Sequence, residues 1–231
     1  MSVVSETTLA PPPSLVPDAS ALFPCEVVVL SSPVFDARAD LQTAERALVA
    51  RAVPKRQHEF ATGRRLARQI LARLGAANFG LLADADRAPL WPVGIVGSIS
   101  HSHGLCVVAA AKRGELVGIG VDVEEADGVR PEIWRRVLGT EEERWLRARP
   151  EAEQLQLAAV FFSAKEALYK AQFPLTRARL GFHDVALELD PARGEFRARA
   201  PGFARPLEGT YAIRSRWVLT GLSLHSGDAP A

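Results

Sequence analysis

The chain contains 231 residues, of which 48% are hydrophobic and 24% are charged, and its formal net charge is +1. A chain of this length folds as one large domain or two small ones without disulfides or a structural metal, and its ordinary composition excludes a disordered or collagen-like protein. The near-zero charge gives no reason to expect nucleic acid, no apolar run approaches the roughly 20 residues of a membrane helix, and two cysteines exclude a disulfide framework.

The first half of the chain mixes short strands with helices. Residues 1–20 are rich in proline and small polar side chains, and we expect a poorly ordered arm there. They carry neither the basic region nor the apolar stretch of a secretory signal, so we expect a cytoplasmic protein with reduced thiols. A strand is predicted over 25–30 and two helices between 40 and 75, interrupted at Pro54. Two strands are predicted within 95–111.

The second half begins with a predicted strand over 116–124 and a helix over 131–149. The most regular helical pattern covers 151–172. After Pro174, four short β-rich pieces predict an antiparallel meander, at 185–189, 196–200, 211–216 and 217–224. Because helices and strands do not alternate regularly, the pattern favours an α+β fold over a doubly wound sheet.

The charges are segregated along the chain. Basic residues dominate 46–73, and acidic residues dominate 115–153. Two solvated helical faces of opposite sign would explain this pattern. A basic surface for a polyanion beside an acidic surface that holds a metal would explain it as well.

Two carboxylates alternate with core residues on the strand at 120–124. Asp122 and Glu124 project from the same side of this strand, because successive side chains point to opposite faces. Carboxylates held this close repel each other unless a cation lies between them, and Mg²⁺ prefers such oxygen ligands. Taken alone, the pattern fits an acidic strand end equally well.

The segment 161–170 holds two of the four lysines in a chain that otherwise uses arginine for positive charge. On a helix, Glu166 and Lys170 share a face, and Lys165 flanks them. A capping box from Ser163 to Glu166 is the structural alternative. However, the apolar run before Ser163 indicates that the helix is already under way, and the scarcity of lysine favours a compact ammonium beside a phosphate.

Two further segments carry candidate binding residues. His101 lies among small hydroxyl residues, including Ser100, and this pattern favours a phosphate or sugar contact over zinc, for which no fourth ligand is evident. A polar turn between strands remains the alternative. Gly63 interrupts an otherwise helical basic pattern at a cost of about 1 kcal/mol relative to alanine, so we expect a close approach by a ligand or a neighbouring element.

Four segments follow one another in a distinctive order: RQHEFATGRRLAR (56–68), APLWPVGIVGSISHS (88–102), GIGVDVE (118–124) and FFSAKEALYKA (161–171). This order closely resembles the 4′-phosphopantetheinyl transferases, specifically the larger monomeric type represented by enterobactin synthase component D. The resemblance runs from about Leu22 to Gly181 and departs at Phe162, where many relatives have tryptophan. It implies a pseudodimer of two similar α/β halves, 21–114 and 115–231, with coenzyme A bound in the cleft between them.

The resemblance also implies a reaction and a site. The 4′-phosphopantetheine arm of coenzyme A would pass to a serine of an apo carrier protein, releasing adenosine 3′,5′-bisphosphate. Asp122, Glu124 and Glu166 would hold Mg²⁺, with Mn²⁺ as an alternative. Glu166 and Lys170 would be catalytic, with Glu166 as the base either directly or through a metal-bound water. The coenzyme A contacts would come from both halves of the chain, at Arg56, Arg64, Arg87, Ser100, His101, Asp122, Lys165 and Lys170.

The partners implied are coenzyme A and acidic, helical carrier domains of polyketide, nonribosomal peptide or siderophore synthesis, with no nucleic acid and no membrane. Two other functions remain open at this point. One is a Mg²⁺-dependent phosphodiesterase or nuclease, in which the basic segment 46–73 grips nucleic acid. The other is a non-catalytic module that binds carrier proteins.

Overall fold

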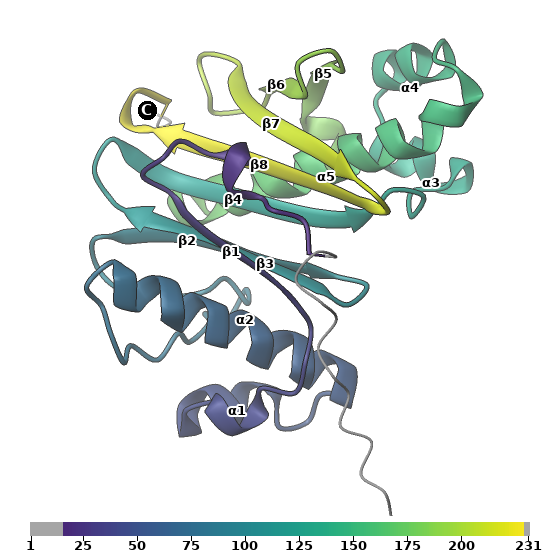
Figure 1. Ribbon diagram of the computed structural model, residues 1–231. Coiled ribbons are helices and arrows are strands. Elements are labelled where there is room, and N and C mark those ends of the chain that lie inside the picture. The colour runs from purple at the N-terminus through teal and green to yellow at the C-terminus, as the bar shows by residue number, and fades with distance from the viewer. Residues whose placement is uncertain (1–15, 229–231) are drawn as a thin grey trace, which may run out of the picture.

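The computed structural model describes residues 16–228 (Figure 1). Most of the predicted N-terminal arm therefore lies outside the described residues. The end of that segment is packed: Ala19 is buried, and a short 3-10 helix, η2 (Ser20–Leu22), follows it. No helix between residues 16 and 228 combines the length and the apolar character needed to cross a membrane.

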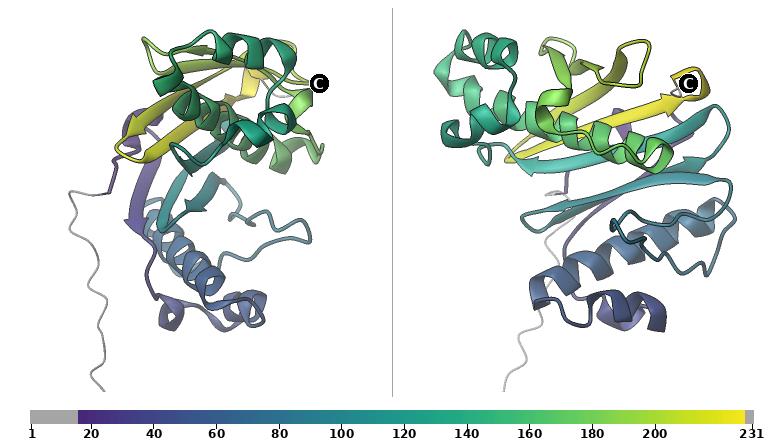
Figure 2. Two further views of the ribbon diagram at one scale, coloured as in Figure 1. Left: turned by 90° about the vertical axis from the view of Figure 1, so that its right-hand side faces the viewer. Right: turned by 180° about the vertical axis from the view of Figure 1, so that it is seen from behind.

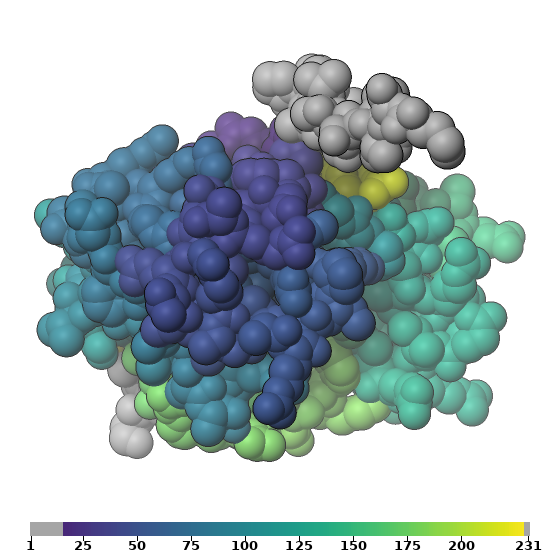
Figure 3. All heavy atoms as spheres, turned by 90° about the horizontal axis from the view of Figure 1, so that it is seen from below, coloured from purple at the N-terminus to yellow at the C-terminus, as the bar shows by residue number. Residues whose placement is uncertain are grey.

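The first half of the chain forms a three-stranded antiparallel sheet covered by helices. The strands β1 (Val28–Pro33), β2 (Ile95–Ser102) and β3 (Leu105–Lys112) lie in the order β1-β3-β2. Between β1 and β2 come the 3-10 helix η3 (Arg38–Asp40) and the helices α1 (Thr43–Val49) and α2 (Pro54–Arg73). Pro54 occupies the first turn of α2, where its missing N–H costs nothing. Figure 3 shows α1 and α2 from outside, covering this side of the molecule.

The second half builds a five-stranded antiparallel sheet in the order β4-β8-β7-β6-β5, so the predicted meander is confirmed. Its strands are β4 (Leu116–Glu125), β5 (Ala186–Asp190), β6 (Glu195–Arg199), β7 (Leu207–Arg214) and β8 (Trp217–His225). Between β4 and β5 lie α3 (Pro131–Val137), α4 (Thr140–Arg147), α5 (Glu151–Thr176) and the 3-10 helix η4 (Phe182–Asp184), and η5 (Ser226–Asp228) follows β8.

Two helix predictions need correction. The segment 131–149 forms two short helices instead of one, because the chain turns extended at Leu138 before α4 begins. The helix α5 runs past Pro174 to Thr176, and the left-handed Arg177 ends it. A proline two residues from the end of a helix disturbs only its last turn.

The two halves repeat one topology. In each, a strand leads to a long helix and then to a hairpin, and the last strand of that hairpin lies beside the first: β1, α2, β2 and β3 in one half, and β4, α5, β7 and β8 in the other. This β-α-β-β repeat confirms the pseudodimer, although the two sequences show no repeat. The α+β class is confirmed as well.

The two sheets lie between the two long helices, α2 on one side and α5 on the other (Figures 1 and 2). A shared core fills the space between the sheets, with Val107 and Ala109 of β3 packed among Val121, Val123 and Leu219 of the second half. The halves therefore meet along β2, β3 and β4. Residues 113–115 link β3 to β4, close to the predicted boundary between 21–114 and 115–231.

Glycines allow the close approach on which the site depends. A Cβ at Gly120 of β4 would lie 1.8 Å from the carbonyl oxygen of Ala167. Only glycine therefore lets α5 pack directly onto β4 at the level of Glu166 and Lys170. At Gly63 of α2, a Cβ would lie 3.1 Å from the side chain of Ile99, which supplies the packing reason expected for a glycine inside this helix.

Candidate functional site

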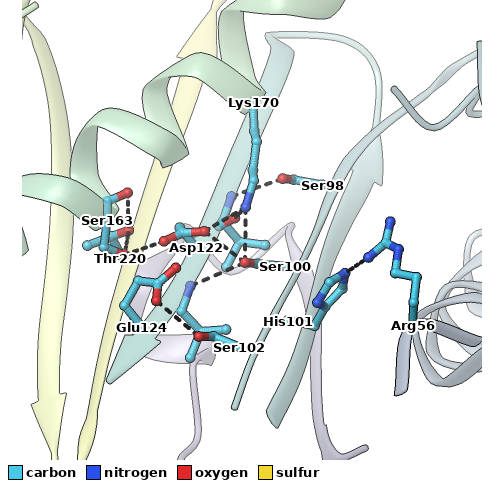
Figure 4. A network of polar contacts seen from close by, with 12 residues as sticks. Arg56, Ser98, Ser100, His101, Ser102, Asp122, Glu124, Ser163, Lys170 and Thr220 are labelled. Carbon is cyan, nitrogen blue, oxygen red and sulfur yellow. Dashed lines mark hydrogen bonds and ion pairs between the residues drawn. The ribbon is translucent and has the colours of Figure 1, made fainter. Parts of the chain in front are cut away.

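Asp122 is the centre of a polar network between β2, β4 and α5 (Figure 4). Its carboxylate is 2% exposed. One oxygen accepts a hydrogen bond from Ser100 (2.8 Å) and an ion-paired bond from Lys170 Nζ (2.6 Å). The other oxygen accepts from Ser163 Oγ of α5 (2.8 Å). Both oxygens of this enclosed carboxylate therefore have hydrogen-bond donors.

Three serines of β2 face β4 because they alternate along the strand. Ser98 Oγ accepts from the backbone N–H of Val121 (3.1 Å), and Ser102 Oγ donates to Glu124 (3.0 Å). Between them, Ser100 contacts both Asp122 and Lys170. These hydroxyls join the two halves at a point where β2 and β4 belong to different sheets.

Sequence reasoning selected Ser100 and missed Ser98, Ser102 and Ser163. The alternation of serines at 98, 100 and 102 could have predicted all three β2 hydroxyls of the network, because alternate residues share one face of a strand. Ser163 was read as a possible helix cap. It lies in the middle of α5, fully buried, where its hydroxyl contacts Asp122 and Thr220.

Glu124 and Glu166 lie near Asp122, and its negative charge affects the pKa of both. Burial raises the pKa of Glu124 to about 7, and the negative charge of Asp122 adds to this shift. Burial also raises the pKa of Glu166, where the positive charge of Lys170 opposes the shift and Asp122 reinforces it. The three acidic side chains of the predicted metal site are therefore near enough for the charge of Asp122 to raise the pKa of the other two.

These three carboxylates fit a divalent cation in chemistry and in charge. They offer the hard oxygen ligands that Mg²⁺ prefers, and a cation would relieve their mutual repulsion. Between residues 16 and 228, no three acidic, histidine or cysteine side chains lie close enough to form a metal-binding group as they stand.

The two lysines of α5 have separate environments, and the surroundings of Lys165 do not favour the predicted contact with coenzyme A. Lys165 is 2% exposed, and its three N–H groups are used by Glu142 (2.6 Å) and by the carbonyl oxygens of Val137 and Phe182. It has no donor left for a phosphate, and it points away from the Asp122 network. Lys170 is 27% exposed and belongs to that network, as predicted from its place on the helix.

A cavity of about 360 Å³ lies on the α2 side of β2. All four basic side chains predicted to contact coenzyme A from the first half line it: Arg56, Arg64, Arg87 and His101. Burial lowers the pKa of Arg64 to about 10, and its guanidinium stacks 4.1 Å from the ring of Phe60. Because Ser100 and His101 are neighbours on one strand, the cavity and the Asp122 network lie on opposite sides of β2.

The loop that carries Arg87 is tied to the second half of the chain. Asp86 pairs with Arg179 (2.5 Å), and Asp84 pairs with Arg177. Arg87 itself has a positive φ of 67°, which directs the chain around the rim of the cavity.

Glu59 is a cavity residue that sequence reasoning missed. It is 9% exposed, and its Oε2 lies 3.4 Å from His101 Nδ1. Arg56 contacts the other ring nitrogen of His101. Burial lowers the pKa of His101 to about 4, with help from the charges of Arg56 and Lys170. The only signal for Glu59 was that it is the single acid in a basic segment.

A second hollow of about 400 Å³ begins directly beside Glu166. Its walls are mainly apolar and come from the end of α5 and the segment before β5, with Leu168, Tyr169, Arg179, Leu180, Phe182 and Val185. A larger depression of about 760 Å³ lies on the outer face of the five-stranded sheet, away from these groups.

Comparisons with known proteins agree with this arrangement. Residues 44–111 match the 4′-phosphopantetheinyl transferase N-terminal domain, and residues 118–216 match the 4′-phosphopantetheinyl transferase superfamily. The chain is 41% identical over 183 residues to 4′-phosphopantetheinyl transferase Svp of Streptomyces mobaraensis, covering 75% of this chain and 72% of that protein. It is 36% identical over 187 residues to 4′-phosphopantetheinyl transferase PptT of Mycobacterium tuberculosis, covering 78% and 82%.

Two further similarities cover only about half of this chain. Enterobactin synthase component D of Salmonella typhimurium is 34% identical over 119 residues, which cover 51% of this chain and 48% of that protein. A crystal structure of holo-[acyl-carrier-protein] synthase from Thermotoga maritima matches with a TM-score of 0.34 and 21% identity, over 48% of this chain and 64% of that one.

Proposed function

The chain belongs to the 4′-phosphopantetheinyl transferase family, and from this premise we propose a specific reaction for its site. Coenzyme A binds in the basic cavity, and its 4′-phosphopantetheine arm passes to a serine of an apo carrier protein. The reaction depends on Mg²⁺ and releases adenosine 3′,5′-bisphosphate. The observation that carries this proposal is the juxtaposition of a basic cavity and three competing carboxylates on the two sides of β2.

The cavity residues bind the phosphates of coenzyme A. Arg56, Arg64 and Arg87 line the cavity, and arginine forms paired hydrogen bonds with phosphate oxygens. Their spread around one hollow suits a ligand with several phosphates. His101 completes this set at the edge nearest to Lys170.

Asp122, Glu124 and Glu166 would hold Mg²⁺, with Mn²⁺ as an alternative. When held there, such a cation would supply positive charge against the pyrophosphate of coenzyme A. Lys170 lies against Asp122, and its partly exposed ammonium can hold negative charge on the transferring phosphate.

Glu166 is the proposed base that takes the proton from the acceptor serine. Burial raises its pKa, which makes it a stronger base than an exposed carboxylate. The apolar hollow beside it offers the serine and its carrier domain a place to approach, with Arg179 at the rim for an acidic partner.

The position of Arg64 on α2 favours this reaction over the nuclease alternative. Arg64 is 6% exposed and lines the basic cavity, whereas contacts to a nucleic-acid backbone need arginines that face outward. We also propose that the enzyme acts as a monomer in the cytoplasm.

The direct test is the intact mass of apo carrier proteins after incubation with this enzyme, coenzyme A and Mg²⁺, with and without a chelator. Carriers from fatty-acid, polyketide and peptide synthesis form the panel. We expect a gain of one phosphopantetheine arm that disappears with chelator. No gain on any carrier, with coenzyme A binding intact, would contradict the proposed transfer.

A further inference from the structure

A tight turn over residues 84–88 forms one wall of the basic cavity. Ala83 and Pro89 pair across its base as an antiparallel bridge, and the backbone N–H of Arg87 donates to the carbonyl oxygen of Asp84 (3.0 Å). Asp84 and Arg87 both line the cavity, although one is acidic and the other basic. A carboxylate on the wall of a cavity proposed to hold phosphates repels the ligand, so another role must account for its presence there.

The side chain of Asp84 holds the turn together from within. Its Oδ1 accepts from the backbone N–H groups of Asp86 and Ala88, both at 2.9 Å. In return, the backbone N–H of Asp84 donates to the carbonyl oxygen of Ala88 (3.0 Å). Aspartate favours turns because its carboxylate can bind backbone N–H groups that follow it. These bonds stabilise the φ of 67° at Arg87, a left-handed backbone that is unfavourable for a residue with a Cβ.

The other oxygen of Asp84 anchors the turn to the second half of the chain. Oδ2 accepts from the guanidinium of Arg177, the residue that ends α5. Arg177 is itself held in place, because its backbone N–H donates to the carbonyl oxygen of Phe173 (2.9 Å) and its guanidinium lies 5.4 Å from the ring of Phe173. The bond from Arg177 lowers the pKa of Asp84 and neutralises the charge that would otherwise face the cavity.

This anchor differs from the second ion pair of the turn. Asp86 pairs with Arg179, but these side chains are 36% and 78% exposed, as in an ordinary surface pair. The side chain of Asp84 is only 17% exposed, and its other oxygen is already fixed by the turn. Asp84 therefore presents a preorganised acceptor to Arg177, whereas Asp86 does not.

Arg87 depends on the turn for its position. Its side chain is exposed, so the backbone of the turn determines where the guanidinium can reach. A turn that is ordered before the ligand arrives reduces the entropy lost on binding. The order of residues 84–88 should therefore affect how tightly the cavity holds a phosphate.

We propose that Asp84 and Arg177 are positioning residues for coenzyme A. Asp84 orders the turn that presents Arg87 to a phosphate, and Arg177 fixes this turn to the second half and cancels the charge of Asp84. The proposal rests on the proposed function in taking coenzyme A as the ligand. Its consequence is that removing a negative charge from the cavity wall weakens the binding of an anion, which is the opposite of what charge alone would give.

Transfer kinetics of Asp84→Ala test the turn, with a carrier that responds in the intact-mass assay. The variant loses both carboxylate oxygens, so we expect the KM for coenzyme A to rise about tenfold with kcat nearly unchanged, because Arg87 is no longer preorganised. If Asp84 acted only through its charge, the KM would fall. A KM that is unchanged or lower, or a fall in kcat without a rise in KM, would overturn the inference.

Asp86→Asn is the matched control, because it removes a carboxylate from the same turn and leaves the bonds of Asp84 in place. We expect a KM for coenzyme A no higher than that of the wild type. A rise as large as that of Asp84→Ala would show a general effect of the turn's charge and would overturn the role of Asp84.

Two variants of Arg177 test the anchor. Arg177→Gln keeps the internal bonds of the turn and leaves the charge of Asp84 facing the cavity, so we expect the KM for coenzyme A to rise by about three- to tenfold. Arg177→Lys keeps the positive charge and should recover most of the wild-type KM. An unchanged KM in Arg177→Gln would overturn the role of Arg177.

Amide hydrogen exchange, measured by NMR without ligand, tests the turn independently of coenzyme A. The N–H groups of Asp86 and Ala88 should be protected in the wild type and in Arg177→Gln, and should exchange about tenfold faster in Asp84→Ala. Unprotected amides in the wild type would overturn the inference. If the wild type does not bind coenzyme A, the proposed function fails, whereas wild-type binding with an unchanged KM in Asp84→Ala overturns this inference alone.

Discussion

Two charged clusters are centred on lysines that lie five residues apart on α5. They differ in how completely the positive and negative charges of each cluster are paired. The closed cluster is Lys165 with Glu142, at 2% and 5% side-chain exposure. Its carboxylate also accepts from the backbone N–H groups of Gly139 and Leu187, both at 2.7 Å. The open cluster is Lys170 with Asp122, Glu124 and Glu166, where one ammonium faces three carboxylates.

The difference shows what each cluster can do. In the closed cluster, one positive and one negative charge cancel, and every donor of Lys165 has a protein acceptor, so the cluster holds α3, α4, η4 and β5 against α5. The open cluster has more carboxylates than cations, and burial raises the pKa of Glu124 and of Glu166. Surplus charge that the fold does not neutralise is available for a ligand.

The largest expected effect concerns Glu166, the proposed base in the open cluster. Glu166→Gln should lower the rate of phosphopantetheine transfer by about 10²–10⁴-fold, because an amide cannot accept the proton of the serine. Its thermal unfolding should match the wild type. The check is single-turnover transfer under saturating coenzyme A, and full turnover with normal coenzyme A and metal binding would remove Glu166 as the base.

A lysine substitution tests the closed cluster by its stability. Lys165→Met leaves Glu142 buried without its counter-ion, so we expect the free energy of unfolding to fall by about 3–5 kcal/mol. Lys170→Met should cost less, because Asp122 keeps its hydrogen bonds from Ser100 and Ser163, but it should lose activity. Urea unfolding measures both. An equal loss of stability in the two variants would contradict the division into a closed and an open cluster.

The double variant Lys165→Met with Glu142→Gln refines this result. Removing the orphaned charge should restore part of the lost stability, since much of the cost comes from burying an unpaired carboxylate. If the double variant is as unstable as Lys165→Met, the backbone contacts of Lys165 with Val137 and Phe182 matter more than its charge.

The open cluster could be predicted from sequence, and the closed cluster could not. Alternation along a strand placed Asp122 and Glu124 on one face, and helical spacing placed Glu166 and Lys170 together. Both rules act within one element. The partner of Lys165 is Glu142, 23 residues earlier on another helix, and no local periodicity reports such a contact.

Local sequence patterns are limited in the same way for the fold, because they do not report how distant elements are arranged. The meander was readable because four short pieces rich in strand-forming residues follow one another, whereas the repeat of the two halves is visible only in the strand order of the two sheets. Family resemblance supplied the pseudodimer and the assignment of Lys165 to coenzyme A. The pseudodimer is confirmed because topology is shared within a family. The assignment of Lys165 stays a prediction, and its buried pairing with Glu142 does not favour it, because a side chain's partners depend on its own surroundings.

Metal binding should stabilise the open cluster in a pH-dependent way. The folded-state pKa of Glu124 is about 7, above its ordinary value of 4.5, so the folded protein holds this proton to higher pH than the unfolded chain. The free energy of unfolding should therefore fall, by on the order of 2 kcal/mol, as pH rises from about 4.5 to about 7. Mg²⁺ should restore this loss at pH 8 and have little effect at pH 5.

Thermal unfolding with and without MgCl₂ at these two pH values measures the effect, with CaCl₂-free buffer and chelator as the baseline. Glu124→Gln removes the titrating group, and the difference between the variant and the wild type isolates it from the opposite contribution of His101. A stabilisation by Mg²⁺ that is equal at both pH values, or unchanged in Glu124→Gln, would show that the metal binds elsewhere.

The smallest expected effect concerns the hydroxyl that α5 offers to Asp122. Ser163→Ala removes one donor from a carboxylate that is 2% exposed, so we expect the free energy of unfolding to fall by about 1–2 kcal/mol. Ser102→Ala is the control, because its partner Glu124 carries a carboxyl that is already half protonated near pH 7, and it should cost less. Equal costs in urea unfolding would mean that Asp122 is held chiefly by Lys170 and Ser100. A larger cost at Ser163 would mean that α5 positions the central carboxylate as well as the base, so that one helix aligns both groups on β4.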